Sequence, residues 1–460
     1  MFRIPLGSTQ RYCDGLSRRN FLQIGVAGMG AAGLSQVLSL KEASAAATGI
    51  KKDTSVILLW LDGGPGHMDL YDLKPEAPPE YRGLWRPIKT NVSGIEISEL
   101  FPLQAKIADK FSIVRSLHHD SGDHFTGGHW MLTGRNAGVG GGSTPGKFPF
   151  FGSIATKLTG PRQAGLPANV AIPHAMSIGL RPGYFGGNYL GPQENPFETE
   201  GDPNNDKFQV RDLQLSDQLT LDRLQNRRSL IAHFDHLRRE TDRSGTLDAM
   251  DRFDRQAFDL VTGDKARSAF DLSQEDAKNR DRYGRHSWGQ GTLLARRLVE
   301  AGATFVTCHF GGWDHHWDLQ KGMENYLPKI DQLVSALFSD LAERGLSEKV
   351  LVVLCGEFSR TPRMNDGGNG GAPMSMGTPG RDHWGSAMFC LLGGGGVQGG
   401  RIVGSTNRLG ESPLDRPVQP GDIHHTIFRV LGVDPHVNFL DHTGRPIPAI
   451  DHGSVIEELF

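Results

Sequence analysis

Histidine and carboxylate side chains gather at a few points of this sequence, each next to a short apolar run. Residues 118–129 hold four His and two Asp, and residues 311–318 read Gly-Gly-Trp-Asp-His-His-Trp-Asp. Imidazole and carboxylate groups are metal ligands and carriers of protons. Together they suit Zn, Mn or Fe better than Ca, which prefers oxygen ligands alone. The sequence therefore predicts a site for one or two divalent ions of the Zn, Mn or Fe class.

His, Asp, Glu and Arg residues close to the ends of apolar runs are the candidate site residues. The predicted metal ligands are Asp62, Asp314, His316, Glu357, Asp382 and His383. The predicted catalytic residues are His119 and His124, which could move protons, and Arg360, whose planar guanidinium could clamp an anionic oxygen. Two structural alternatives stay open, namely an ordinary turn at Asp62 and a plain ion pair between Glu357 and Arg360.

The apolar runs predict the elements that must position these side chains. Six short runs are expected to be buried strands: 56–61, 111–114, 170–172, 304–309, 350–355 and 387–392. Most are continuous rather than alternating, which is typical of strands covered on both faces. Helical patterns lie between them, at 124–132, 288–301, 325–344 and 423–431. This predicts an α/β sandwich with a mostly parallel central sheet flanked by helices on both faces, whose site lies at the strands' carboxyl ends.

Other features of the sequence limit the possible functions. The net charge of -3 gives no basic surface for nucleic acid, and no segment after the N-terminal run is apolar enough to predict a membrane helix. The segment 216–285 is rich in charged residues and predicts an inserted pair or trio of surface helices. Cys308, Cys355 and Cys390 lie in apolar runs, so we interpret them as core residues and not as disulfide partners.

The N-terminal residues predict export. Ser17-Arg18-Arg19-Asn20-Phe21-Leu22 precedes an apolar, glycine-rich run, and two Ala-x-Ala patterns follow at residues 43–47. We interpret residues 1–47 as a twin-arginine signal peptide and residues 48–460 as a single mature domain, with an uncleaved anchor as the alternative. The expected location is periplasmic or secreted, reached through the twin-arginine (Tat) export machinery and without a stable membrane span after processing.

Several stretches resemble the alkaline phosphatase–sulfatase superfamily and, within it, the exported DUF1501 family. They are Leu59–Gly64, Leu298–His316, Gly356–Pro362, Gly380–Trp384 and the closing helix Pro420–Gly432, so the likeness spans essentially the whole mature chain. The resemblance implies an alkaline-phosphatase-like sandwich with a two-metal site. In that site Asp62 matches the first-strand ligand, Asp314 and His316 match a second pair, and His383 matches the late His.

Two positions depart from the superfamily pattern. Counting back from Thr133-Gly134, the nucleophile position falls on His124, where Ser, Thr or Cys is usual, and the nearest hydroxyls belong to Ser121 and Thr126. Glu357 stands where an Asp is expected, and Phe358 stands where a His follows. His124 is therefore either a ligand that replaces the missing His or a nucleophile of another kind.

These expectations combine into one functional hypothesis. The chain would be an exported metal-dependent hydrolase of anionic esters, sulfate or phosphate, that acts on a small ester or on a sulfated or phosphorylated glycan. Arg360 would neutralise charge on the transferred oxygens. The alternative is a non-catalytic secreted metal-containing protein that binds a glycan or a protein partner, and the His in the nucleophile position favours it.

Overall fold

The computed structural model describes residues 53–136, 147–163, 165–210, 263–366 and 378–460. The predicted signal peptide and most of the predicted insertion lie outside these ranges. From Asp53 onward the chain forms one compact unit. The part of the insertion that is described contains two short helices, α8 (Asp264–Phe270) and α9 (Ala277–Tyr283).

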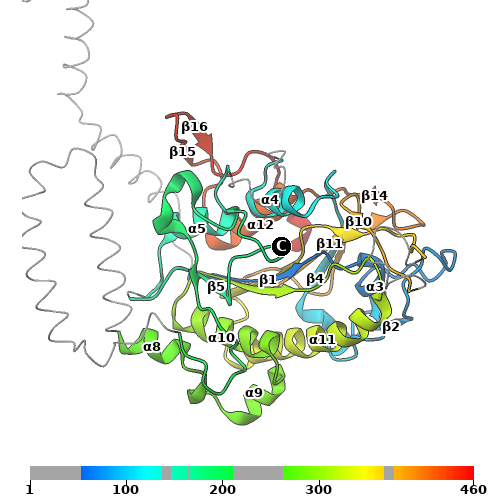
Figure 1. Cartoon of the computed structure of the whole chain (residues 1–460), viewed down its shortest axis with the longest axis horizontal. Helices are drawn as coiled ribbons and strands as arrows, with labels where there is room; N and C mark the ends of the chain where they lie inside the picture. The colour runs from blue at the N-terminus through cyan, green and yellow to red at the C-terminus, as the bar shows by residue number, and fades with distance from the viewer. Residues whose placement is uncertain (1–52, 137–146, 164, 211–262, 367–377) are drawn as a thin grey trace, which may run out of the picture. The chain divides into compact units, whose positions relative to one another are not determined.

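An eight-stranded sheet forms the centre of the molecule (Figure 1). In spatial order its strands are β12 (Ile402–Val403), β4 (Ser112–Leu117), β11 (Met388–Gly393), β8 (Val350–Cys355), β1 (Ser55–Asp62), β7 (Phe305–Gly311), β5 (Asn169–Ile172) and β6 (Phe197–Glu198). Only β11 runs antiparallel to its neighbours. All six predicted strands are present, and the predicted mostly parallel sheet is confirmed.

Helices cover both faces of the sheet, as Figure 1 shows. One face carries α4 (His124–Thr133), α5 (Phe151–Thr159) and α12 (Pro420–Leu431), and the other carries α10 (Ser287–Ala301) and α11 (Leu319–Glu343). The four predicted helices are confirmed, whereas α5 was not predicted. Its sequence, Phe-Gly-Ser-Ile-Ala-Thr-Lys-Leu-Thr, is short and contains Gly and three residues of low helix propensity, so packing must decide its conformation.

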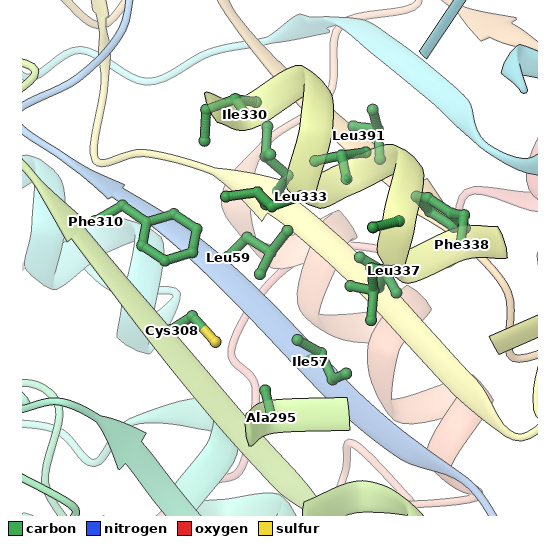
Figure 2. Close-up of a cluster of buried hydrophobic side chains, with 14 of the residues drawn as sticks. Ile57, Leu59, Ala295, Cys308, Phe310, Ile330, Leu333, Leu337, Phe338 and Leu391 are labelled. Carbon is green, nitrogen blue, oxygen red and sulfur yellow. The ribbon is translucent and has the colours of Figure 1, made fainter. Parts of the chain in front are cut away.

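Alternate side chains of each strand pack into one of two apolar cores. Ile57 and Leu59 of β1 meet Cys308 of β7 and the side of α11 that carries Leu333 and Leu337, as Figure 2 shows. The intervening residues of β1, such as Leu58 and Trp60, pack toward α4, α5 and α12. Since every residue of β1 is buried, its continuous apolar run reflects burial on both faces.

Smaller elements complete the described fold. They are the helix α3 (His67–Leu70) and four two-stranded antiparallel sheets: β2 (Pro87–Lys89) with β3 (Glu96–Ser98), β9 (Ser359–Arg360) with β10 (His383–Trp384), β13 (Ser405–Thr406) with β14 (Pro413–Asp415), and β15 (Asn438–Leu440) with β16 (Pro446–Pro448). The 3-10 turns span Gln104–Lys106, Ala108–Lys110, Asn188–Leu190, Pro192–Glu194, Leu272–Gln274 and Glu457–Leu459. None of the described helices combines the length and apolar character that a membrane span needs.

Candidate metal centre at the carboxyl edge of the sheet

Three adjacent parallel strands bring carboxylates to one edge of the sheet. Strands β8, β1 and β7 lie side by side, so their carboxyl ends open at the same edge. Asp62 is the last residue of β1, Asp314 lies just beyond β7, and Glu357 lies just beyond β8. The carboxylates that the strand-end rule selected from the sequence therefore lie at one edge of the sheet.

Two other elements bring imidazoles to the same edge. His124 is the first residue of α4, and the preceding Asp123 caps this helix by accepting a hydrogen bond from Thr126 N. His383 lies on β10, where it pairs with Arg360 of β9. Both residues are thus held by regular backbone structure at the edge where the parallel strands end.

Four side chains converge at this edge, and we call them the Asp314 group: Asp314, His124, His316 and His383. Asp314 Oδ2 lies 3.2 Å from His124 Nε2, while Asp314 Oδ1 lies 3.0 Å from His316 Nε2 and 3.2 Å from His383 Nε2. The Nε2 atoms of His316 and His383 are 3.0 Å apart. The candidate ligand atoms of His124, Asp314 and His383 all lie within 4.8 Å of one another.

The Nδ1 atom of each imidazole, which we call the outer nitrogen because Nε2 faces Asp314, lies within hydrogen-bonding distance of an oxygen atom. The pairs are His124 with Glu357 Oε1 at 2.7 Å, His316 with Asp382 Oδ1 at 2.8 Å, and His383 with the Gly122 carbonyl at 2.7 Å. A carbonyl can only accept, so His383 must carry its proton on Nδ1 in this contact. The same arrangement at the other two imidazoles leaves every Nε2 facing Asp314.

Arg360 is buried and fully committed to the site's framework. Its Nη2 lies 2.6 Å from Asp314 Oδ1, and its Nε donates to the Gly64 carbonyl at 2.7 Å. The same guanidinium also donates to the carbonyls of Gly63 and Arg381. Arg360 therefore fixes the Asp314 carboxylate, and its ion pair is with Asp314 rather than with Glu357.

The pKa shifts follow from this crowding. Burial alone would raise the pKa of Asp314, but hydrogen bonds from His124, His316 and His383 hold it far below its usual range. Burial opposes the charged form of His124, yet the Asp314 and Glu357 carboxylates raise its pKa to about 9. Glu357 is fully buried, and this burial raises its pKa despite the contact with His124.

Asp62 belongs to a neighbouring cluster. Its Oδ1 accepts from Ser177 Oγ at 2.9 Å, and its Oδ2 accepts from Ile178 N at 2.7 Å and lies 3.1 Å from His309 Nε2. Burial raises the pKa of Asp62, but the contacts with His309, Ile178 and Ser177 together outweigh it, and the net shift is downward. The sequence predicted Asp62 as a ligand beside Asp314, whereas its described contacts are with these three residues and with Trp60.

His119, predicted to move protons, is held by backbone groups. Its Nε2 lies 2.6 Å from the Glu357 carbonyl, and its Nδ1 accepts from Ser121 N at 3.1 Å. The ring is almost fully buried and stacks on Trp130. Since both nitrogens are engaged, the contacts of His119 fix the backbone around Glu357.

The loop after β1 approaches the Asp314 backbone so closely that only glycine fits. Gly63 has a φ of +113°, and a Cβ built on it would lie 2.6 Å from Asp314 N. Its amide also donates to Glu357 Oε1 at 2.8 Å. The glycine turn after Asp62 therefore brings the carboxyl end of β1 close to the residues that follow β7 and β8.

His174 and His309 were not among the predicted site residues. His309 contacts Asp62, and its ring lies 4.6 Å from that of His174. His174 follows the end of β5, which is the next parallel strand along the sheet. The strand-end rule could have identified His174, and a polar residue within the otherwise apolar run of β7 was the signal for His309.

The fold and the site define a class of protein. It is an α/β sandwich that carries a His and Asp cluster at the carboxyl edge of a mostly parallel sheet. Residues 53–460 match the family model described as "Protein of unknown function (DUF1501)", and the chain belongs to this family. No curated protein matches the sequence.

Solved structures that match the chain do so at low sequence identity. A phosphonate monoester hydrolase from Silicibacter pomeroyi is 11% identical, with a TM-score of 0.41 over 88% of this chain and 76% of the other. A sulfatase from Pseudoalteromonas sp. is 14% identical, with a TM-score of 0.37 over 87% and 71%. A protein in the alkaline phosphatase superfamily from Vibrio parahaemolyticus is 11% identical, with a TM-score of 0.37 over 83% and 67%.

Proposed function

We propose that the Asp314 group binds a divalent metal ion and that the protein is a metal-dependent hydrolase of anionic esters. The observation that carries this proposal is convergence, because three imidazole Nε2 atoms face a single carboxylate. Three His and one Asp form a donor set that suits Zn, with Mn and Fe as alternatives. His124 Nε2 is buried and lies 3.2 Å from Asp314 Oδ2, so the two atoms are close enough to be ligands of one ion.

The residues that hold the outer nitrogens are assigned an orienting role. A carboxylate or carbonyl that accepts from Nδ1 fixes the imidazole's tautomer and presents a lone pair on Nε2. Glu357 and Asp382, expected from the sequence to be ligands, take this role for His124 and His316. His124, whose role the sequence left open, becomes a ligand.

A bound ion of this class supplies a Lewis acid for an ester oxygen and lowers the pKa of a bound water. The chain's own residues position the ester and shield it. Arg360 holds Asp314, and the Phe358 ring, 4.8 Å from the His124 ring and 4.5 Å from that of His383, forms an apolar wall.

We assign the nucleophile to water. The nearest hydroxyls noted in the sequence are used in the cap of α4, since Ser121 Oγ donates to the Asp123 carbonyl and Thr126 Oγ1 donates to Asp123 Oδ1. Because both hydroxyls already donate hydrogen bonds to Asp123, neither is a good candidate for a covalent nucleophile. The alternative function, a non-catalytic metal protein, predicts bound metal without turnover.

A second ion, if one binds, is assigned to Asp62 and His309. These two side chains are 3.1 Å apart, and His174 Nδ1 nearby is buried without a hydrogen bond among the described residues. Metal analysis of the wild type and of Asp62→Asn separates the two stoichiometries. One ion in both proteins assigns the metal to the Asp314 group alone, and two ions reduced to one by the substitution assign the second to Asp62.

Metal analysis combined with an ester assay tests the proposal. The purified protein is expected to contain about one Zn, Mn or Fe and to hydrolyse 4-nitrophenyl phosphate or 4-nitrophenyl sulfate. Asp314→Ala should lose both the metal and the turnover, whereas Asp415→Ala, which changes an exposed hairpin carboxylate, should keep both. Metal without turnover would support the binding protein, and absence of metal from the wild type would refute both.

We also propose that the chain is exported through the twin-arginine route. The motif Arg18-Arg19 and the following apolar run support this proposal. Cell fractionation tests it. The wild-type chain should reach the periplasm or medium, and replacement of both arginines by Lys should retain it inside the cell.

A further inference from the structure

A pocket of about 540 Å³ is lined by residues of β2, β3 and β4 and by the segment that follows α3. We call it the Arg115 pocket, after the β4 residue that lines it. Its volume is in the range that holds small organic ligands. It shares no lining residue with the Asp314 group or with the Asp62 cluster. The Arg115 pocket is therefore a place in the fold that the proposed metal chemistry does not use.

The guanidinium of Arg115 lacks acceptors for most of its N–H groups. Within the described part of the chain, its Nη2 donates to the Glu96 carbonyl at 3.0 Å, and its Nε is buried without a hydrogen-bond partner. A guanidinium carries five N–H donors, and a buried donor that has no acceptor costs free energy. A ligand that brings acceptor oxygens to Arg115 would remove this cost.

The carboxylates of the lining compensate the charge of Arg115 only in part. Burial lowers the pKa of Arg115 although the carboxylates of Asp72 and Glu96 act in the opposite direction. Asp72 is engaged by two other residues, since its Oδ1 lies 3.2 Å from Lys74 Nζ and its Oδ2 accepts from Thr406 Oγ1. Glu96 is exposed, and its hydrogen bond with Arg115 uses the backbone carbonyl.

The lining as a whole carries one net positive charge. Its cations are Lys74, Lys89 and Arg115, and its carboxylates are Asp72 and Glu96. A ligand with a single negative charge balances this lining. A second negative charge on the ligand would have no counter-charge and would be repelled by the two carboxylates.

The rest of the lining is largely apolar, and it includes Leu73, Pro75, Pro87, Val92 and Ile95. Apolar parts of a ligand gain free energy when they leave water for such a surface. The planar fork of a guanidinium matches the two oxygens of a carboxylate. The pocket thus offers a place for a carboxylate and a place for the apolar body that carries it.

We infer that the Arg115 pocket binds a small organic monocarboxylate, with its carboxylate on the Arg115 guanidinium and its apolar body against the proline and aliphatic side chains. This site goes beyond the proposed function, because it requires neither the Asp314 group nor a metal ion nor ester hydrolysis.

Saturation-transfer NMR on the purified protein tests the inference, with benzoate and hexanoate as probes. At least one of them should bind, and benzamide, the neutral counterpart of benzoate, should bind about tenfold more weakly because it lacks the charge. Phenylphosphonate, which carries a second charge, should also bind more weakly than benzoate. Absence of binding by both carboxylates, equal binding of benzamide, or tighter binding of phenylphosphonate would overturn the inference.

Substitutions assign the binding to the pocket. Arg115→Met should weaken carboxylate binding at least about tenfold, because charge-assisted hydrogen bonds are lost. Arg408→Met changes an exposed arginine outside the pocket and should leave binding unchanged. Asp314→Ala should also leave it unchanged, since the site does not involve the candidate metal centre. Binding that survives Arg115→Met, or that is lost in Asp314→Ala, would overturn the inference.

Two exposed residues of the lining keep the test decisive if Arg115→Met fails to fold. Lys89→Met removes a cation and should weaken carboxylate binding about threefold, whereas Glu96→Gln removes a repelling carboxylate and should tighten it by a similar factor. Thermal unfolding checks that each variant is folded. Unchanged binding in both variants, or changes of the opposite sign, would overturn the inference.

Discussion

Two clusters of charged and imidazole side chains, each with at least one buried member, are built on opposite plans in this protein. In the Asp314 group, three imidazoles face a single carboxylate. In the second cluster, among α9, α10 and α11, arginines and carboxylates alternate in pairs. We call this second cluster the Arg296 network, made of Arg296, Arg297, Arg344, Glu275, Glu300 and Asp340. The comparison separates a cluster to which we assign a ligand from one to which we assign a role in the fold.

Positive and negative charges are balanced within the Arg296 network. Arg296 is almost fully buried and contacts Glu275 at 2.6 Å, Glu300 at 2.6 Å and Asp340 at 3.0 Å. Arg344 contacts the same three carboxylates, so each charge has an opposite neighbour. In the Asp314 group, three imidazole Nε2 atoms surround one carboxylate, and the proposed cation would be bound by all four side chains. We therefore assign the balanced network to the fold, and the proposed metal ion to the three imidazoles that converge on Asp314.

The largest effect is expected from breaking the network. Arg296→Met should lower the free energy of unfolding by about 3–5 kcal/mol, because it removes the most deeply buried cation from the carboxylates of Glu275 and Asp340. Urea denaturation measures this loss. Arg282→Met, which breaks only the exposed pair with Glu343, should cost less than about 1 kcal/mol. Equal costs for the two substitutions would contradict the difference between the buried and exposed pairs.

Metal addition should stabilise one cluster only. Zinc at about 100 times its dissociation constant should raise the stability of the wild-type protein by roughly 2.7 kcal/mol, because it binds the native state. Thermal unfolding with and without zinc measures the shift. Arg297→Met, a change in the Arg296 network, should retain the full response, and Asp314→Ala should lose it. A response that survives Asp314→Ala would place the ion elsewhere.

The orienting contacts should have a smaller effect. Glu357→Gln and Asp382→Asn should each weaken zinc binding by about 10–100-fold, because each loosens an imidazole without removing a ligand. Competition with a chromophoric chelator measures the affinity. Glu324→Gln, on the exposed surface of α11, serves as the control. Complete loss of the metal in either variant would instead make that carboxylate a ligand, as the sequence predicted.

The smallest effect is the pH dependence of the Arg296 network. Burial opposes ionisation of Glu275, but hydrogen bonds from Asn279 and Arg297 and the charge of Arg296 lower its pKa to about 2. A depressed carboxylate pKa contributes stability that is present above pH 4.5 and is lost as the pH falls toward 2. Partial exposure limits the loss to about 1–2 kcal/mol. Urea denaturation at pH 6 and pH 3 should show a weaker pH dependence in Glu275→Gln, and an unchanged dependence would contradict this assignment.

The fold was largely predictable because buried parallel strands leave a strong sequence signal. The runs that became β1 and β8 are continuous and apolar, and their ends differ from the predicted bounds by one residue at most. The mostly parallel sheet was predicted, and the antiparallel direction of β11 was not, because strand direction depends on long-range pairing. Helix α5 also lacks a clear local signal, since its position depends on packing against the sheet.

The candidate site was predictable in its members and less so in their contacts. The strand-end rule places Asp314 and Glu357 at one edge because parallel strands end together. It does not distinguish a carboxylate facing the centre from one facing an imidazole's outer nitrogen, because that depends on side-chain direction. His119 shows the same limit, since a dense His motif gives no sign that one ring is held by backbone groups.

Anomalous diffraction from zinc-soaked crystals tests the central claim most directly. A single strong zinc peak is predicted within about 2.0–2.2 Å of the Nε2 atoms of His124, His316 and His383 and of a carboxylate oxygen of Asp314. A zinc peak bonded to Asp62 and His309 instead, or no peak at all near Asp314, would contradict the account.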